Sequence, residues 1–322
     1  MGIKFLKWYI SLNSDALLSD IDLRNRIIVI DGKNLMREQM RKLKNEFGRY
    51  GTTYEKFAQR ITCIFDKMVR VCLIKPIVVL DSLHDKTMED CIASYIHKIS
   101  NKSRANKASA PTLYKMIFRD ILKKMGITLI QPIGKDIDTI AVISKVYNCP
   151  VLSCDNDYYL YRVTYLINSQ FGHPPGSNKQ LLCLRGQLFE TEKFQHYYNL
   201  KESLLPLAMA LLGKHDRLLD CELMDVFNEY LNDNFHSDAI ELAHQRFDRL
   251  FMWLSQHENM YQAITNLSVF YGREDRKTIL YLIEKYMRHH ARPSRLVLEF
   301  LGVNNHTISE LETKHDEMIS GL

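Results

Sequence analysis

The stretch Ile27-Ile28-Val29-Ile30-Asp31-Gly32 decides the fold class, because it is a short apolar run that ends in an acid and a turn former. Two similar runs follow, Pro76-Ile77-Val78-Val79-Leu80-Asp81 and Pro150-Val151-Leu152-Ser153-Cys154-Asp155. Short, continuous apolar runs bounded by turn residues are typical of buried parallel strands. We therefore predict an α/β fold with a parallel, twisted sheet flanked by helices.

The rest of the chain divides into an alternating part and a helical part. Up to about residue 200, strand and helix patterns alternate, which is typical of βαβ units. Beyond residue 201 only helical periodicity remains. We predict a sheet domain over residues 1–200 and a helical region over 201–322 packed on it. Further strands are expected at 128–131, 165–168 and 180–184, and helices at 54–73, 136–146, 204–212, 223–231, 240–254, 260–270 and 278–290.

The acids at the strand ends are the candidate site. In an open parallel sheet, ligands bind beyond the carboxyl ends of the strands, so acids there would converge on one volume. Such a cluster repels itself unless cations fill it, and hard divalent cations prefer oxygen ligands. Two such ions side by side form a phosphodiester-cleaving centre. The acids are Asp31, Asp81, Asp155 and Asp157 after strands, and Asp136 and Asp138 at the start of a helix.

Each of these acids also has a purely structural interpretation. An aspartate after a strand is commonly a turn former or a helix N-cap. Asp136 and Asp138 would complement the dipole in the first turn of their helix. The repetition of aspartate at three strand ends favours the metal-site hypothesis.

Charge is unevenly distributed along the chain. The 322 residues are 46% hydrophobic and 25% charged, with a formal net charge of +5, which is an ordinary globular composition. One segment, 95–124, holds eight Lys or Arg and a single acid, which suits contacts with a phosphate backbone. A solvated helix pair is the simpler alternative. The candidate nucleic-acid contacts in this segment are Lys98, Lys102, Arg104, Lys107 and Lys115. Lys86 is a candidate electrophilic helper that would stabilise negative charge on the scissile phosphate.

The seven cysteines contain no C-x-x-C pair, which argues against a zinc site. Cys63, Cys72 and Cys154 lie in apolar runs and are expected to be buried. Unpaired cysteines fit a reducing compartment. We expect no membrane attachment, since the longest apolar run, 204–212, is far too short to span a bilayer.

In their order and spacing, the motifs resemble the flap-endonuclease/XPG-type structure-specific nucleases, and most of all the asteroid branch of that superfamily. The resemblance covers most of the chain. The motifs are Met1-Gly2-Ile3, Val29-Ile30-Asp31-Gly32, Val79-Leu80-Asp81, Asp136-Ile137-Asp138, Cys154-Asp155-Asn156-Asp157, Leu211-Leu212-Gly213 and the helical segment 247–254.

The resemblance implies a PIN-like fold with an acidic two-metal site. In that family pattern Asp31 and Asp81 hold one metal, and Asp155 and Asp157 serve the second. Asp136 and Asp138 stand where the family has paired glutamates. The implied cofactor is two Mg²⁺ ions, which Mn²⁺ can replace. Helices over about 86–124 would form an arch that guides a single strand, Gly2 would lie beside the DNA, and a nuclear location is implied.

The chain departs from the family pattern in two further places. Asp216, a candidate metal ligand, stands three residues after Gly213, whereas the family places its last aspartate two after the glycine. The segment 217–232 contains no glycine, so the family's glycine-rich helix–hairpin–helix is missing. The asteroid branch shares this second departure.

These observations predict a Mg²⁺-dependent endonuclease or exonuclease that hydrolyses DNA at single-strand/double-strand junctions such as flaps, splayed arms or overhangs. Two alternatives remain open. The acidic site does not distinguish sugars, so a PIN-type RNA nuclease fits as well. A nuclease fold that has lost activity and serves as a nucleic-acid-binding scaffold is the other, since fold does not imply function.

Overall fold

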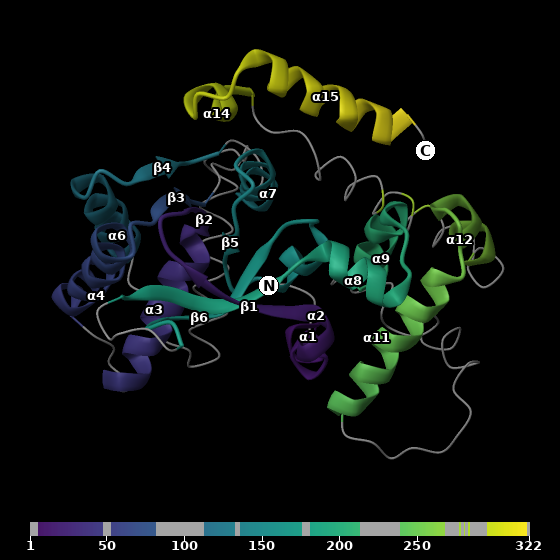
Figure 1. Cartoon of the computed structure of the whole chain (residues 1–322), viewed down its shortest axis with the longest axis horizontal. Coiled ribbons are helices and arrows are strands. Elements are labelled where there is room, and N and C mark those ends of the chain that lie inside the picture. The colour runs from purple at the N-terminus through teal and green to yellow at the C-terminus, as the bar shows by residue number, and fades with distance from the viewer. Residues whose placement is uncertain are drawn as a thin grey trace, which may run out of the picture. The chain divides into compact units, whose positions relative to one another are not determined.

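The computed structural model describes residues 6–47, 53–81, 113–132, 136–175, 181–212, 239–267, 277, 280, 283 and 295–320 (Figure 1). Its strands form a seven-stranded sheet in the order β1-β7-β6-β5-β2-β3-β4. The predicted α/β class, a sheet flanked by helices, is confirmed. The strands are β1 (Leu18–Leu23), β2 (Ile27–Asp31), β3 (Lys75–Val79), β4 (Thr128–Ile130), β5 (Val151–Leu152), β6 (Tyr165–Gly172) and β7 (Cys183–Phe189).

The helices account for most of the remaining described chain, and past residue 201 every described element is a helix. Within the described residues, no helix has the length and apolar character needed to cross a membrane. The helices are α1 (Leu6–Leu12), α2 (Ser14–Leu17), α3 (Gly32–Phe47), α4 (Tyr54–Asp66), the π-helical turn η1 (Lys67–Val71), α6 (Leu113–Lys124), α7 (Asp136–Val146), the 3₁₀ turns η2 (Asn156–Leu160) and η3 (Glu202–Leu204), α8 (Thr191–Tyr198), α9 (Leu205–Leu212), α11 (Ala239–Ser255), α12 (Met260–Leu267), α14 (Arg295–Phe300) and α15 (Asn305–Ser320).

The central strands pair in parallel, as the apolar runs predicted. Strand β2 pairs with β3 from Ile27 opposite Lys75 to Asp31 opposite Val79, and β2 also pairs with β5. Strand β3 pairs in parallel with β4. This register places the end of β2, at Asp31, at the same edge of the sheet as the residues that follow β3, which include Asp81.

The core around these strands is apolar on both the sheet and the helices. Residues 28–31 of β2 and 76–79 of β3 are buried. Helix α7 packs against β2, β3 and β5, and α3 packs against β2 and β3. Helices α4 and α6 pack together through aromatic rings, with Phe57 and Tyr114 at 4.6 Å between ring centroids and Phe65 and Phe118 at 6.2 Å. Gly126 follows the end of α6 in the left-handed conformation, with φ of 68°, which is typical of a helix C-terminus.

Two local predictions were wrong, and a third was confirmed with a shorter end. Gly32 was expected in a polar turn, but it begins the sixteen-residue helix α3. The helix expected at 54–73 is found as α4 to Asp66 and a π-helical turn to Val71, and it ends there because Leu73 adopts a φ of 56° that no helix continues. Cys63 and Cys154 are exposed, whereas Cys72 is buried as expected.

Some predicted elements lie outside the described residues. These are the first helix of the basic segment, the helix at 223–231 and most of the helix at 278–290.

By its contacts, the chain separates into two compact units. One comprises residues 22–154 and 168–186, and contains β2 to β5 with α3, α4, α6 and α7. The other comprises residues 1–21, 155–167 and 187–322 and is largely helical. The boundary predicted from the sequence, near residue 200, stays a prediction.

The largely helical unit has its own aromatic core. Tyr9 of α1, Tyr198 of α8 and Phe251 of α11 lie within 5.1 to 6.5 Å of one another between ring centroids. The hydroxyl group of Tyr9 hydrogen-bonds with that of Tyr198 and donates to the carboxylate of Asp248 on α11. Tyr158, Tyr159 and Tyr161 are buried in the core as well.

Candidate metal and phosphate site

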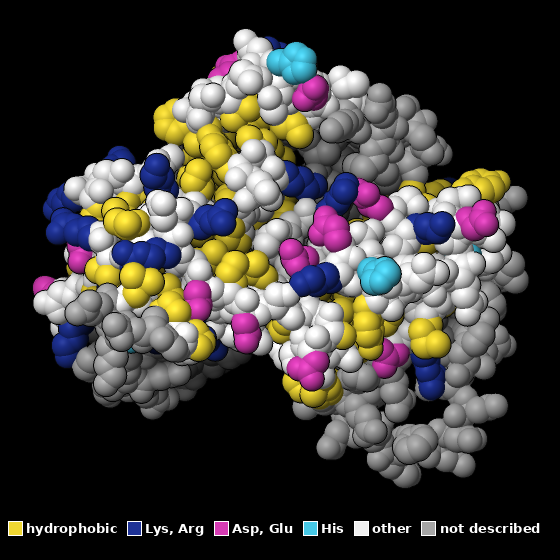
Figure 2. All heavy atoms as spheres, viewed as in Figure 1, with side chains coloured by type: hydrophobic (Ala, Val, Ile, Leu, Met, Phe, Trp, Pro, Cys, Tyr) yellow, Lys and Arg dark blue, Asp and Glu magenta, His cyan; other side chains and the backbone are white. Residues whose placement is uncertain are grey.

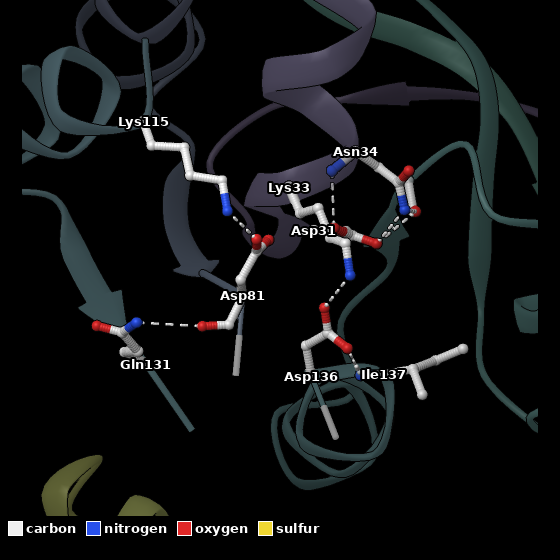
Figure 3. Close-up of polar contacts among 9 residues, drawn as sticks. Asp31, Lys33, Asn34, Asp81, Lys115, Gln131, Asp136 and Ile137 are labelled. Atoms are coloured by element: carbon white, nitrogen blue, oxygen red, sulfur yellow. Dashed lines mark hydrogen bonds and ion pairs between the residues drawn. The ribbon is translucent and has the colours of Figure 1, made fainter. Parts of the chain in front are cut away.

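Asp31 is the most enclosed acid of the predicted cluster, with 5% of its surface exposed. It caps helix α3, because its Oδ1 accepts a hydrogen bond of 2.9 Å from the backbone N–H of Asn34. Its Oδ2 accepts from Asn34 Nδ2 at 2.5 Å and from Ser153 Oγ at 2.9 Å (Figure 3). Burial raises the pKa of Asp31, these donors lower it, the negative charge of Asp136 adds to the rise, and the net shift is upward.

Asp81 follows β3 and is held by two residues of neighbouring elements. Its carboxylate forms an ion pair with Lys115 of α6, with 2.5 Å between Nζ and Oδ2. Its backbone carbonyl accepts from Gln131 Nε2 at 3.2 Å (Figure 3). Asp81 therefore lies at the sheet edge that was predicted from the sequence, and its carboxylate is paired with the ammonium group of Lys115.

Asp136 opens helix α7, and its carboxylate faces the start of α3. Lys33 Nζ lies 3.2 Å from its Oδ2, and its Oδ1 accepts from the backbone N–H of Ile137 at 3.2 Å (Figure 3). Its charge acts on Asp31, so these two carboxylates lie within electrostatic range of each other. Asp138, two residues further along α7, is buried.

Asp155 and Asp157 lie at the start of η2, in the largely helical unit. Asp155 caps this turn, since its side chain accepts a hydrogen bond of 3.3 Å from the backbone N–H of Asp157. The capping role considered for these strand-end aspartates is thus realised at both Asp31 and Asp155. A capping hydrogen bond engages one lone pair of a carboxylate oxygen, so the other lone pairs can still bind a cation.

A cavity of about 150 Å³ opens beside Asp81. Three cationic side chains line it, those of Lys33, Lys115 and Arg119, and Asp81 is the one acid among the described residues that line it. Its remaining wall is largely apolar, with Met36 and Phe118 among the lining side chains. Along its whole length, helix α6 carries four Lys or Arg residues and one acid. In Figure 2, Lys and Arg side chains outnumber acids on the surface where α4 and α6 lie.

Most of the predicted nucleic-acid contacts lie outside the described part of the chain. Lys115 is described and lies at the site, but seven other candidates lie outside the described residues. They are Gly2, Lys86, Lys98, Lys102, Arg104, Lys107 and Asp216.

Four residues at the site were not predicted from the sequence. Asn34 and Ser153 orient Asp31, Lys33 neutralises Asp136, and Arg119 lines the cavity. Asn34 had a recognisable signal, because an N–H three residues after a strand-end aspartate is the usual partner of an N-cap. Lys33 and Ser153 had none, since their partners lie 103 and 122 residues away in the sequence.

In their chemistry, the carboxylates of the site suit a hard divalent cation. Asp31, Asp81 and Asp136 offer oxygen atoms alone, which is the ligand type that Mg²⁺ prefers. Two of the three carboxylates already face an ammonium group, so a positive charge is accommodated at these positions. Within the described part of the chain, no group of three or more His, Cys, Asp or Glu side chains is close enough together to hold a metal ion.

Comparison with known proteins gives relatives of one kind. No protein-family model matches the chain. It is 25% identical over 296 residues to the human protein named single-strand DNA endonuclease ASTE1, covering 88% of this chain and 43% of that protein. It is 26% identical over 171 residues to protein asteroid of Drosophila melanogaster, covering 52% of this chain and 20% of that protein. The chain thus spans less than half the length of these relatives.

Two solved nuclease structures align with most of the chain. The catalytic core of Rad2 in complex with a DNA substrate aligns with a TM-score of 0.49 and 13% identity, over 92% of this chain and 85% of that one. Flap endonuclease-1 from Methanococcus jannaschii aligns with a TM-score of 0.44 and 15% identity, over 88% of this chain and 98% of that one. The sequence comparisons are the informative ones: the chain is similar to the human ASTE1 protein over most of its length and to protein asteroid over about half of it, as its motifs predicted.

Proposed function

We propose that this chain is a divalent-metal-dependent nuclease that hydrolyses phosphodiester bonds of DNA. One observation supports this most strongly. The buried carboxylate of Asp31 ends the central strand β2, within electrostatic range of Asp136, and the register of β2 with β3 brings Asp81 to the same sheet edge. This arrangement occurs in a chain that is similar in sequence to a protein named single-strand DNA endonuclease.

The proposed cofactor is a pair of Mg²⁺ ions, which Mn²⁺ can replace. The ligands proposed for the first ion are Asp31 and Asp81, which follow strands, together with Asp136 and Asp138 of α7. The ligands proposed for the second ion are Asp155 and Asp157. When bound, such ions lower the pKa of a water molecule and stabilise the leaving oxygen. Asp216, which lies outside the described residues, is proposed as an additional ligand.

The chain's own residues prepare the site for this chemistry. Asn34 and Ser153 hold the carboxylate of Asp31 in one orientation, so ligand geometry is fixed before any ion arrives. Lys33, Lys115 and Arg119 give the cavity a net positive charge, which attracts a phosphate group. Lys86 and the helical arch over about 86–124, with Gly2, Lys98, Lys102, Arg104 and Lys107, are proposed to guide the strand.

The proposed substrate is DNA with a single-stranded arm, such as a flap, a splayed arm or an overhang. This proposal implies a nuclear location. Cleavage of RNA is the competing enzymatic proposal, since an acidic metal site does not distinguish the two sugars.

One observation favours a second candidate function, an inactive scaffold that binds nucleic acid. Both Asp81 and Asp136 are neutralised by lysines, so the metal-free site is already charge-compensated. A fold of this kind can persist after catalysis is lost.

A panel of substrates distinguishes the DNA nuclease from the RNA nuclease and from the inactive scaffold. End-labelled flap, splayed-arm, overhang and single-stranded substrates, in DNA and in RNA, would be incubated with Mg²⁺, Mn²⁺ or EDTA. We expect metal-dependent cleavage of the DNA substrates that carry a single-stranded arm, and none by the Asp31→Ala/Asp155→Ala double variant. Binding without cleavage of any substrate would support the scaffold, and preferred cleavage of RNA would support the RNA nuclease.

A further inference from the structure

The lysine that neutralises Asp81 also lines the cavity beside it. Lys115 pairs with Asp81 across 2.5 Å, yet 63% of its side chain is exposed, whereas Asp81 is 28% exposed. An ion pair with such exposure contributes little stability, because water and salt screen it. The ammonium group of Lys115 can therefore leave Asp81 for another partner at little cost.

Arg119 supplies a second donor to the same cavity. It stands one helical turn after Lys115 on α6, so the two side chains share one face of the helix. Its Nε atom is buried and has no hydrogen-bond acceptor within the part of the chain that the structure describes. A buried donor without an acceptor is costly, so a turn of the Arg119 side chain that brought its guanidinium group to an anion in the cavity would be favourable.

The cavity holds more positive than negative charge. Lys33, Lys115 and Arg119 line it with Asp81 as the one acid among its described lining residues, and Lys33 is itself paired with Asp136. A divalent ion at Asp81 would repel the ammonium group of Lys115, since both would compete for one carboxylate. The released ammonium group and the guanidinium group of Arg119 would then both be available to one phosphate.

We propose that Lys115 exchanges partners: it is the counter-ion of Asp81 in the metal-free protein, and with Arg119 it binds a nucleic-acid phosphate when a divalent cation takes the carboxylate. This inference rests on the proposed function and adds its regulation. Lys115 thereby couples the two ligands, so that metal binding strengthens strand binding. By linkage, strand binding strengthens metal binding by the same factor.

The exchange makes separate predictions for metal affinity and for coupling. Metal affinity would be measured by titration calorimetry with Mg²⁺ and with Ca²⁺. The affinity for a fluorescent single-stranded oligonucleotide would be measured by polarisation in Ca²⁺ or in EDTA, with Ca²⁺ used to separate binding from cleavage. In the unsubstituted chain we expect the divalent ion to tighten oligonucleotide binding by at least about fivefold.

Three variants of α6 test the role of Lys115. Lys115→Met should bind the metal several-fold more tightly, because no ammonium group competes, and should bind the oligonucleotide equally with and without Ca²⁺. Arg119→Met should weaken oligonucleotide binding in Ca²⁺ and leave metal affinity unchanged. Lys123→Met is the matched control, since Lys123 is an exposed lysine of the same helix that does not line the cavity. It should retain both the metal affinity and the coupling.

The outcomes distinguish the exchange from the function on which it rests. If the wild-type protein binds both ligands but Lys115→Met keeps the metal affinity and the full coupling, the exchange is wrong while the nuclease proposal stands. If the wild-type protein binds no oligonucleotide in either condition and cleaves none, both proposals fail.

Discussion

Asp31 combines structural and chemical constraints at a single residue. It caps α3, accepts from Ser153 and lies almost completely buried at the end of the central strand. Burying a carboxylate is unfavourable unless donors compensate, and here burial still raises its pKa despite three donated hydrogen bonds. A buried acid with a raised pKa is typical of a functional site, where residues needed for activity lower the stability of the fold.

The raised pKa gives a stability prediction for Asp31→Asn in metal-free buffer. An acid whose pKa is higher in the folded state binds more protons there than in the unfolded chain. Stability is therefore lost as pH rises from the ordinary value of 3.8 through the folded pKa. We expect Asp31→Asn to remove this loss, so the variant should be at least as stable as wild type near pH 7. Its advantage should shrink as pH falls toward 3.8. Urea unfolding with EDTA across this pH range would measure it, and a variant that is less stable at every pH would contradict the prediction.

The hydrogen bond from Ser153 to Asp31 is a second test at this scale. Ser153→Ala removes a buried donor to a buried carboxylate, which should lower the free energy of unfolding by about 1–3 kcal/mol. The two residues act on each other, so the cost of Ser153→Ala should be smaller in the Asp31→Asn background. A double-mutant cycle on denaturant unfolding measures the difference. Strict additivity would show that the two side chains do not interact.

At the scale of elements, the close approach of α3 to β3 depends on Gly32. A Cβ atom at this position would lie 2.8 Å from Val78 Cγ1 and 2.9 Å from the carbonyl oxygen of Val79. The carbonyl belongs to the sheet backbone and cannot move aside. We expect Gly32→Ala to lower stability by about 1–3 kcal/mol, as overpacking does.

Gly172→Ala is the matched control for Gly32→Ala. There the nearest atom is Cδ of the Arg185 side chain at 3.0 Å, and a flexible arginine can turn away. This variant should change the free energy of unfolding by less than about 0.5 kcal/mol. Thermal and urea unfolding of both variants give the comparison, and equal costs would show that the contact with β3 is not what requires glycine.

The buried hydroxyl group of Tyr9 connects helices within the largely helical unit. Tyr9→Phe leaves Asp248 of α11 without its donor from α1, and should cost about 1–3 kcal/mol. Burial is the main cause that raises the pKa of Tyr9 above its ordinary value of 10.0. Wild type should therefore lose stability above pH 10.0, where the unfolded tyrosine ionises and the folded one does not, and Tyr9→Phe should lose less.

Tyr197→Phe is the control for the buried tyrosine, because Tyr197 is 51% exposed. Removing its hydroxyl group should change stability by less than about 0.5 kcal/mol. Unfolding followed by circular dichroism at neutral and alkaline pH measures both variants. A cost at Tyr9 no larger than that at Tyr197 would refute a structural role for the hydroxyl group.

The same elements show what the sequence could and could not predict. The apolar runs of β2 and β3 were recognisable because parallel strands are buried on both faces. Helix α3 was missed because its first residues are glycine, lysine and asparagine, which are typical of a turn. Strand β1 was missed because its sequence, LSDIDL, carries two aspartates and no continuous apolar run.

The acids of the candidate site were easier to predict than their partners. Strand ends are visible in the local sequence, so Asp31 and Asp81 could be placed at one sheet edge. The partners of these acids come from distant segments: Lys115 is 34 residues from Asp81, and Ser153 is 122 residues from Asp31. No local pattern encodes such a contact, so the lysine-paired state of the site became visible only in the structure.

At the scale of the whole molecule, charge and site fit the same function. The chain has a formal net charge of +5, and the segment 95–124, which includes α6, holds much of its excess of Lys and Arg. The described end of this segment borders the cavity next to Asp81. A basic surface beside a set of carboxylates suits a polyanion that is cut with the help of metal ions.

Cleavage by the Asp31→Asn variant is the most direct test of the central claim, because this change removes one charge at the buried carboxylate and alters its size little. The unsubstituted chain and the variant would be incubated with an end-labelled single-stranded DNA and a flap in Mg²⁺ or EDTA. We expect cleavage by wild type in Mg²⁺ alone, and a loss of at least about 100-fold in the folded variant. Equal cleavage by the two proteins, or cleavage by wild type in EDTA, would contradict a metal-dependent site at Asp31.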